Sequence, residues 1–108
     1  MCTYIVNFHL DYNETYSERR KQLISFFNPP KGYQSDATST LMLHSSLDTD
    51  GFINDLLDNV TLDISDYLLI FQVGLYAQII KVIEYQDGKF VENLVLLDAL
   101  KNFRNPFE

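Results

Sequence analysis

The chain has one cysteine, no long hydrophobic run and few basic residues, and each shortage excludes a class of protein. Its single cysteine, Cys2, has no partner within the chain, which excludes a disulfide scaffold and a cysteine-based zinc site. No run approaches the roughly 18 consecutive apolar residues that span a bilayer. The first residues also lack the charged flank and cleavage site of a signal peptide. We therefore expect a cytoplasmic protein without a membrane segment.

Basic residues are outnumbered, with 8 Lys and Arg against 15 Asp and Glu and a formal net charge of -7. Between Gly32 and Ile80 the sequence has no Lys or Arg. That stretch contains seven aspartates, namely Asp36, Asp48, Asp50, Asp55, Asp58, Asp63 and Asp66. Such a surface repels phosphate, whereas nucleic acid binds chiefly through basic contacts, so we expect weak nucleic-acid binding at most. Net charge of this kind also serves simply to keep a small protein in solution. The candidate surface for a basic protein partner consists of Asp48, Asp50, Asp55, Asp58 and Asp63.

Motifs for phosphate binding and nucleophilic catalysis are missing as well. The 4 glycines form no phosphate-binding loop, and there is no Gly-x-Ser-x-Gly elbow or metal-spaced set of Cys and His. One basic cluster, Arg19, Arg20 and Lys21, is a candidate phosphate-binding site. Because Glu14 and Glu18 lie within a helical turn of it, a solvated helix face is the favoured interpretation. We predict no metal ion and no other cofactor.

What the sequence does contain is enough apolar residues for one core. The 108 residues are 46% apolar, which suits a single domain spanning residues 1–108. Folding at this length removes a little over 60% of the surface that the unfolded chain exposes, so the core needs no disulfide.

The apolar pattern alternates between strand and helix periodicity. The expected strands are Thr3–Leu10, a weak Tyr33–Thr38, Thr40–His44, Tyr67–Val73 and Gln78–Tyr85. The expected helices are Tyr16–Phe27, a segment capped by Asp48 that carries Phe52 to Val60, and Val91–Phe103. Alternation places Tyr4, Val6, Phe8 and Leu10 on one apolar face of the first strand. Tyr67–Val73 is apolar on both faces, which is typical of a central strand, and we expect Leu69 and Phe71 to be buried against the helices.

This order predicts an α+β fold, a ferredoxin-like βαββαβ sandwich with both helices on one face of an antiparallel sheet. Residues 76–108 form an additional C-terminal strand and helix of the same domain. The face of the sheet away from the helices carries Ile5 and alternate residues of the later strands. An apolar face of this kind is rarely left exposed in a monomer, so we expect a homodimer.

Three segments resemble the small CRISPR adaptation endoribonucleases, together with virulence-associated protein D and the SinR-like proteins. The segments are Tyr4–Leu10, Ser39–Leu43 leading through Leu47 and Asp48 into a helix, and Ser65–Leu69. The resemblance covers roughly Thr3 to Val73 and implies the ferredoxin-like fold. Activity has to be argued from the site itself.

The resemblance also implies a position for catalysis at the end of the first strand. Nuclease members of the group hold a divalent metal there with an aspartate from each subunit of a dimer. In this sequence His9 occupies the matching position, and Asp11 follows two residues later. Imidazole is a poor substitute for a carboxylate toward Mg²⁺. His9 and His44 could instead meet as ligands or as an acid/base pair, although hydrogen-bonding structural roles are favoured for both.

Two functions remain open at this point. The first is a small acidic dimeric interaction protein, a regulator, adaptor or inhibitor without nuclease activity. The alternative is a metal-dependent endoribonuclease of the resembling group, in which His9 and Asp11 are the catalytic residues and a divalent metal is the cofactor.

Overall fold

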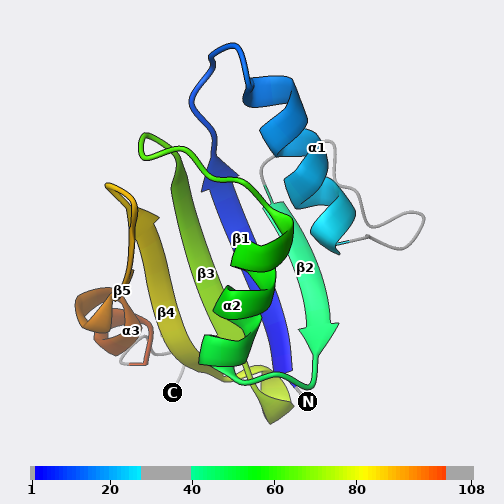
Figure 1. Ribbon diagram of the computed structural model, residues 1–108. Helices are drawn as coiled ribbons and strands as arrows, with labels where there is room; N and C mark the ends of the chain where they lie inside the picture. Colours follow the sequence, from blue (N-terminus) through cyan, green and yellow to red (C-terminus); the bar gives the residue numbers. More distant parts are fainter. Residues whose placement is uncertain (1, 28–39, 102–108) are drawn as a thin grey trace.

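The computed structural model describes residues 2–27 and 40–101. In this part the strands are β1 (Cys2–His9), β2 (Thr40–Ser45), β3 (Tyr67–Val73), β4 (Ile79–Gln86) and β5 (Lys89–Glu92). The helices are α1 (Tyr16–Phe27), α2 (Thr49–Asn59), α3 (Leu94–Lys101) and the short 3-10 turn η1 (Leu75–Ala77). All strand pairs are antiparallel, in the order β2-β1-β3-β4-β5 (Figure 1). This is the predicted α+β class, compatible with a ferredoxin-like fold that carries extra C-terminal elements. The weak strand expected at Tyr33–Thr38 lies outside the described residues.

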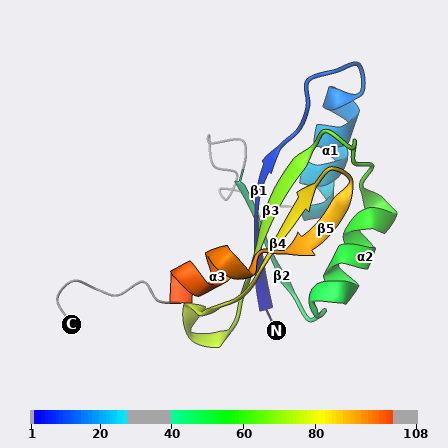
Figure 2. The ribbon, with the colours of Figure 1, turned by 90° about the vertical axis from the view of Figure 1, so that its left-hand side faces the viewer.

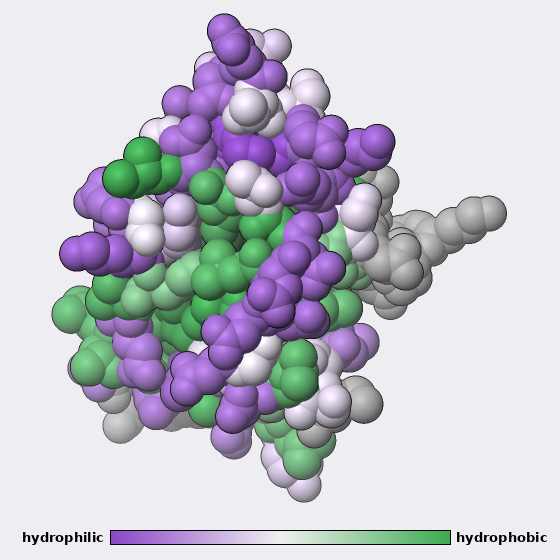
Figure 3. Space-filling model, viewed as in Figure 1, coloured by the Kyte–Doolittle hydropathy of each residue, from purple (hydrophilic) through white to green (hydrophobic). Residues whose placement is uncertain are grey.

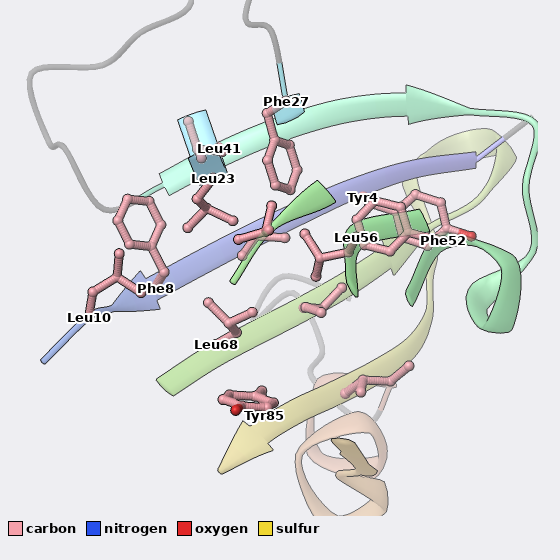
Figure 4. Close-up of a cluster of buried hydrophobic side chains, with 14 residues drawn as sticks. Tyr4, Phe8, Leu10, Leu23, Phe27, Leu41, Phe52, Leu56, Leu68 and Tyr85 are labelled. Atoms are coloured by element: carbon pink, nitrogen blue, oxygen red, sulfur yellow. The ribbon is translucent and has the colours of Figure 1, made fainter. Parts of the chain in front are cut away.

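Helices α1 and α2 cover one face of the sheet (Figure 2). The predicted face of β1 points toward them, because Tyr4, Val6 and Phe8 are buried while Ile5 between them is only half-buried. The ring of Tyr4 stacks on that of Phe52 from α2, with centroids 4.0 Å apart (Figure 4). The alternation of β1 therefore decides which face of the sheet becomes the main core.

Helix α2 begins where the sequence predicts. Asp48 is its N-cap, and the Asp48 side chain accepts a hydrogen bond from the Gly51 N–H at 2.8 Å. This bond satisfies one of the backbone donors that the first turn leaves free. Phe52 and Leu56 are fully buried against the sheet, and the outward side of the helix carries mainly polar residues together with the exposed Leu57.

Strand β3 is central, as predicted, but the expectation about its buried residues is wrong. Leu68 and Ile70 are the side chains buried beneath the helices, whereas Leu69 and Phe71 lie on the other face and are half-buried. The reason is the register with β1, which places Ile70 opposite Val6. A strand that is apolar on both faces does not itself indicate which face meets the helices.

The C-terminal extension differs from the expectation in one element. Residues 89–92 form the strand β5, and the last helix begins at Leu94 instead of Val91. Asp87 and Gly88, with φ of 53° and 79°, form the two-residue turn that joins β4 to β5. Helix α3 then lies on the face of the sheet opposite α1 and α2 (Figure 2) and contacts β4. Val82, whose register partner is Phe71, is buried on that second face.

None of the helices within residues 2–27 and 40–101 has both the length and the hydrophobicity that crossing a membrane requires.

Candidate functional site

A buried ion pair joins α1 to the turn before β3. Arg19 and Asp66 are 3% and 2% exposed, and Nη1 of the arginine contacts the aspartate carboxylate. Asp66 also accepts the backbone N–H groups of Asp11 and Asp63, each at 2.8 Å. Arg19 donates to the Asp11 carbonyl at 2.6 Å and to the Thr15 hydroxyl at 2.9 Å. The network fixes the loop that follows β1 against the turn that precedes β3.

This ion pair changes the role of two predicted residues. Arg19 is committed to Asp66 in the interior, so it cannot serve in a phosphate-binding cluster with its neighbours. Arg20 is half-buried and Lys21 is exposed, which leaves α1 with one fully exposed cation in this cluster. Asp66, in turn, adds nothing to the acidic surface, since its charge is compensated inside the molecule.

The turn before β3 has a second, exposed set of polar contacts. Ser65 donates its backbone N–H to Asp63 Oδ1 at 3.2 Å and its hydroxyl to the same oxygen at 3.0 Å. The backbone bond from Ser65, and then the hydroxyl bond, hold the pKa of Asp63 below its ordinary value. Their contribution to stability is present above the ordinary aspartate pKa and is lost as the pH falls through the lowered value. Asp63 is therefore partly occupied with fixing its own turn.

The two histidines lie at opposite ends of the sheet. His9 ends β1 opposite Tyr67, whereas His44 of β2 lies opposite Thr3. The two positions are six residue steps apart along β1, which is about 20 Å at the rise of a strand. His44 Nδ1 is 2.7 Å from the hydroxyl of Thr3, within hydrogen-bonding distance. The histidines therefore do not form the metal or acid/base pair considered from the sequence.

His9 and Asp11 are both exposed near the same end of β1. The Asp11 carboxylate accepts the Ser65 hydroxyl at 3.2 Å. Over the described part of the chain, no three His, Cys, Asp or Glu side chains come close enough together to hold a metal ion. Within one copy of the described chain, a metal at this end of β1 would therefore not find three such side chains.

Three of the predicted surface acids project from α2. Asp50, Asp55 and Asp58 are exposed, on the side of the helix away from Phe52 and Leu56. Figure 3 shows hydrophilic residues along this outward side of α2. The ion pairs of the described residues are Arg19 with Asp66 and Lys81 with Glu92, so no described cation is paired with these acids. Asp48, at the start of the helix, is exposed but serves as its N-cap.

The second face of the sheet carries an apolar area that α3 covers only in part. Ile5, Leu69 and Phe71 are half-buried there, and Met42 is 38% exposed. Ile5 pairs with both Met42 and Phe71, so Met42, Ile5 and Phe71 form an apolar row across β2, β1 and β3. Helix α3 contacts β4, beyond the end of this row.

One polar cluster was missed in the sequence. Glu84 of β4 accepts a hydrogen bond from the Asn93 side-chain amide, and Asn93 caps α3 by accepting the Leu96 N–H at 2.8 Å. Burial, followed by the nearby Glu84 carboxylate, raises the pKa of Tyr67. The only available signal was the Asn93 N-cap pattern, which was hidden because the apolar residues from Val91 onward were interpreted as helix.

Comparison with known proteins gives no relative from which a function could be transferred: no family model, no curated protein and no solved structure matches this chain.

Proposed function

We propose that the protein is a small acidic interaction protein, a regulator, adaptor or inhibitor, that binds a basic protein partner through α2. The observation that carries this proposal is the uncompensated charge of α2. Asp50, Asp55 and Asp58 are exposed without a paired cation among the described residues. A helix whose other side is anchored in the core holds these charges in fixed relative positions, which favours electrostatic complementarity with a partner.

The α2 acids should dominate binding of a basic probe. The probe is a lysine-rich amphipathic peptide, and the variant is the double substitution Asp55→Asn/Asp58→Asn. Exposed ion pairs contribute about 0.2–1 kcal/mol each, so removing two should weaken binding by roughly two- to thirtyfold. The measurement is titration calorimetry at low and at physiological salt.

A matched control removes the same amount of charge elsewhere. Glu14→Gln/Glu18→Gln changes two exposed acids outside α2, one in the loop before α1 and one in its first turn. We expect this variant to bind the peptide as the wild type does. Equal losses in the two double variants would mean that the peptide responds to net charge alone, and the α2 proposal would be wrong.

We further propose that two copies associate through the apolar row on the second face of the sheet. Support comes from Ile5 and Phe71 of this row and from Leu69, which lies two residues before Phe71 on the same face of β3. All three are apolar and only half-buried, and α3 contacts β4, beyond them. Contiguous exposed apolar surface of this kind is uncommon in monomers. A two-fold axis through this face would let the same residues meet in both copies.

Light scattering at micromolar concentration should therefore give the mass of a dimer. Met42→Asp should shift the population toward the monomer, because each copy would then bring one negative charge to the proposed contact and the two charges would repel each other. Leu57→Asp is the control, since Leu57 is an exposed apolar residue of α2 on the other side of the sheet. A wild-type protein that is monomeric at this concentration would contradict the proposed interface.

A metal-dependent nuclease is the second candidate, favoured by the joint exposure of His9 and Asp11 at one end of β1. Phosphodiester cleavage requires a metal held by hard oxygen ligands, or several cations near the cut. The imidazole of His9 is not a hard oxygen ligand for a metal. Because Arg19 is paired with Asp66, it is also not available as a cation near the cut. We therefore predict no cleavage of labelled RNA or DNA in Mg²⁺ or Mn²⁺. Cleavage that is lost in His9→Ala or Asp11→Ala would establish the nuclease instead.

A further inference from the structure

A groove lies on the second face of the sheet, between the β4–β5 hairpin and the first turn of α3. Its volume is about 680 Å³. Glu84 and Val91, which pair across the hairpin, line it together with Leu94 and Val95 of α3. Helix α3, which contributes Leu94 and Val95 to the groove, lies on the face of the sheet opposite α2 (Figure 2), so the groove is separate from the acidic surface described above.

The lining of the groove includes three exposed aliphatic side chains. Val91, Leu94 and Val95 are 61%, 63% and 84% exposed. Leu94 and Val95 also line the neighbouring hollow along α3, so the apolar surface continues beyond the groove. Burying three aliphatic side chains against a partner is favourable in proportion to the area that leaves water.

The charged residues of the groove are mainly acidic. Its lining contains Glu84, Asp87 and Glu92 against one cation, Lys89. Glu92 is already paired with Lys81, at 3.6 Å. Glu84 is half-buried, and its contacts are with neutral groups, the amide of Asn93 and the phenol of Tyr67. Within residues 2–27 and 40–101 no cation is paired with it.

We propose that this groove binds a segment of a protein partner in which a lysine or arginine side chain is flanked by apolar residues. The cation pairs with Glu84, and the flanking residues cover Val91, Leu94 and Val95. Charge complementarity selects this occupant. A nucleic acid would be repelled by the acidic lining, and the second copy proposed above meets this chain through Met42, Ile5 and Phe71, none of which lines the groove.

The test uses the full chain, labelled with ¹⁵N, and a short capped peptide with one central lysine between leucine and valine. Two matched peptides replace the lysine with norleucine or with glutamate. We expect the lysine peptide to shift the amide signals of Glu84, Val91, Asn93, Leu94 and Val95. The norleucine peptide should bind about tenfold more weakly or worse, because a hydrogen-bonded charge pair is lost.

Two variants change the charged and the apolar part of the groove separately, so the test still stands if one of them perturbs the fold. Glu84→Gln should weaken binding of the lysine peptide about as much as replacing its lysine with norleucine does. Val95→Ser alters a side chain that is 84% exposed. It should weaken binding of both the lysine and the norleucine peptides, because both cover this side chain with apolar residues. Asp55→Asn/Asp58→Asn should leave peptide binding unchanged, so that failure of the α2 proposal and failure of the groove proposal can be told apart.

Three outcomes would overturn the groove proposal. The first is equal binding of the lysine and norleucine peptides. The second is a set of signal shifts confined to α2. The third is concentration-dependent shifts of the groove signals without peptide, which would make a second copy the occupant.

Discussion

Replacing Asp66 with alanine should lower the free energy of unfolding by about 3–5 kcal/mol, the usual cost of breaking a buried ion pair by removing one partner. The substitution leaves the Arg19 guanidinium in the interior without its counter-ion. It also removes the acceptor for the backbone N–H groups of Asp11 and Asp63. For a domain whose total stability is about 5–15 kcal/mol, this is a large fraction.

Urea unfolding followed by circular dichroism measures this change. Asp58→Ala is the matched control, because Asp58 is an exposed aspartate of α2 and surface substitutions usually change stability by less than about 0.5 kcal/mol. An Asp66→Ala midpoint equal to that of Asp58→Ala would show that the ion pair does not stabilise the fold.

A double-mutant cycle separates the pair from the groups around it. Arg19→Met leaves Asp66 with its two backbone donors, and Arg19→Met/Asp66→Asn removes both charges. Residues that share one network are not additive. We therefore expect the double variant to lose less stability than the sum of Arg19→Met and Asp66→Asn.

The second large effect is expected from Leu68, which is fully buried in β3 beneath the helices. Leu68→Ala should cost about 2–5 kcal/mol, because it removes buried methyl groups and leaves a cavity. Its neighbour Leu69 provides a control of identical chemistry on the opposite face, where the side chain is half-buried. We expect Leu69→Ala to cost clearly less, since a partly exposed site loses less transfer energy.

The comparison of the two leucines requires only thermal or urea unfolding of both variants. A greater loss in Leu69→Ala than in Leu68→Ala would mean that the second face is the better buried one. In a dimer formed through that face the cost of Leu69→Ala would depend on protein concentration, whereas the cost of Leu68→Ala would not. Repeating the measurement over a range of concentrations therefore also bears on the proposed interface.

Local sequence patterns were sufficient for the elements that depend on nearby residues. The alternation of Tyr4, Val6 and Phe8 identified both β1 and its core face, and it did so because the neighbouring positions were less apolar. Asp48 marked the start of α2 because a capping side chain acts on donors within three residues. The central place of β3 followed from apolar residues on both of its faces.

Patterns failed where more than one periodicity fitted the same residues. The run from Val91 to Leu100 is apolar enough for a helix throughout, and only pairing with β4 separates β5 from α3. In β3 the sequence pattern did not decide whether Leu68 or Leu69 is buried beneath the helices, since both faces of the strand are apolar. The register with β1 settled it.

The sequence by itself determined the α+β class, the start of the capped helix and the acidic character of the chain, because these follow from composition and from contacts a few residues apart. Only the tertiary structure decided the partner of Arg19, which is 47 residues away in the chain, and the assembly of Glu84, Asn93 and α3 into one groove. Those contacts join separate elements of the chain. Asp66 is the partner of Arg19, among many aspartates, because the two are buried together in the folded chain, and no local pattern encodes that burial.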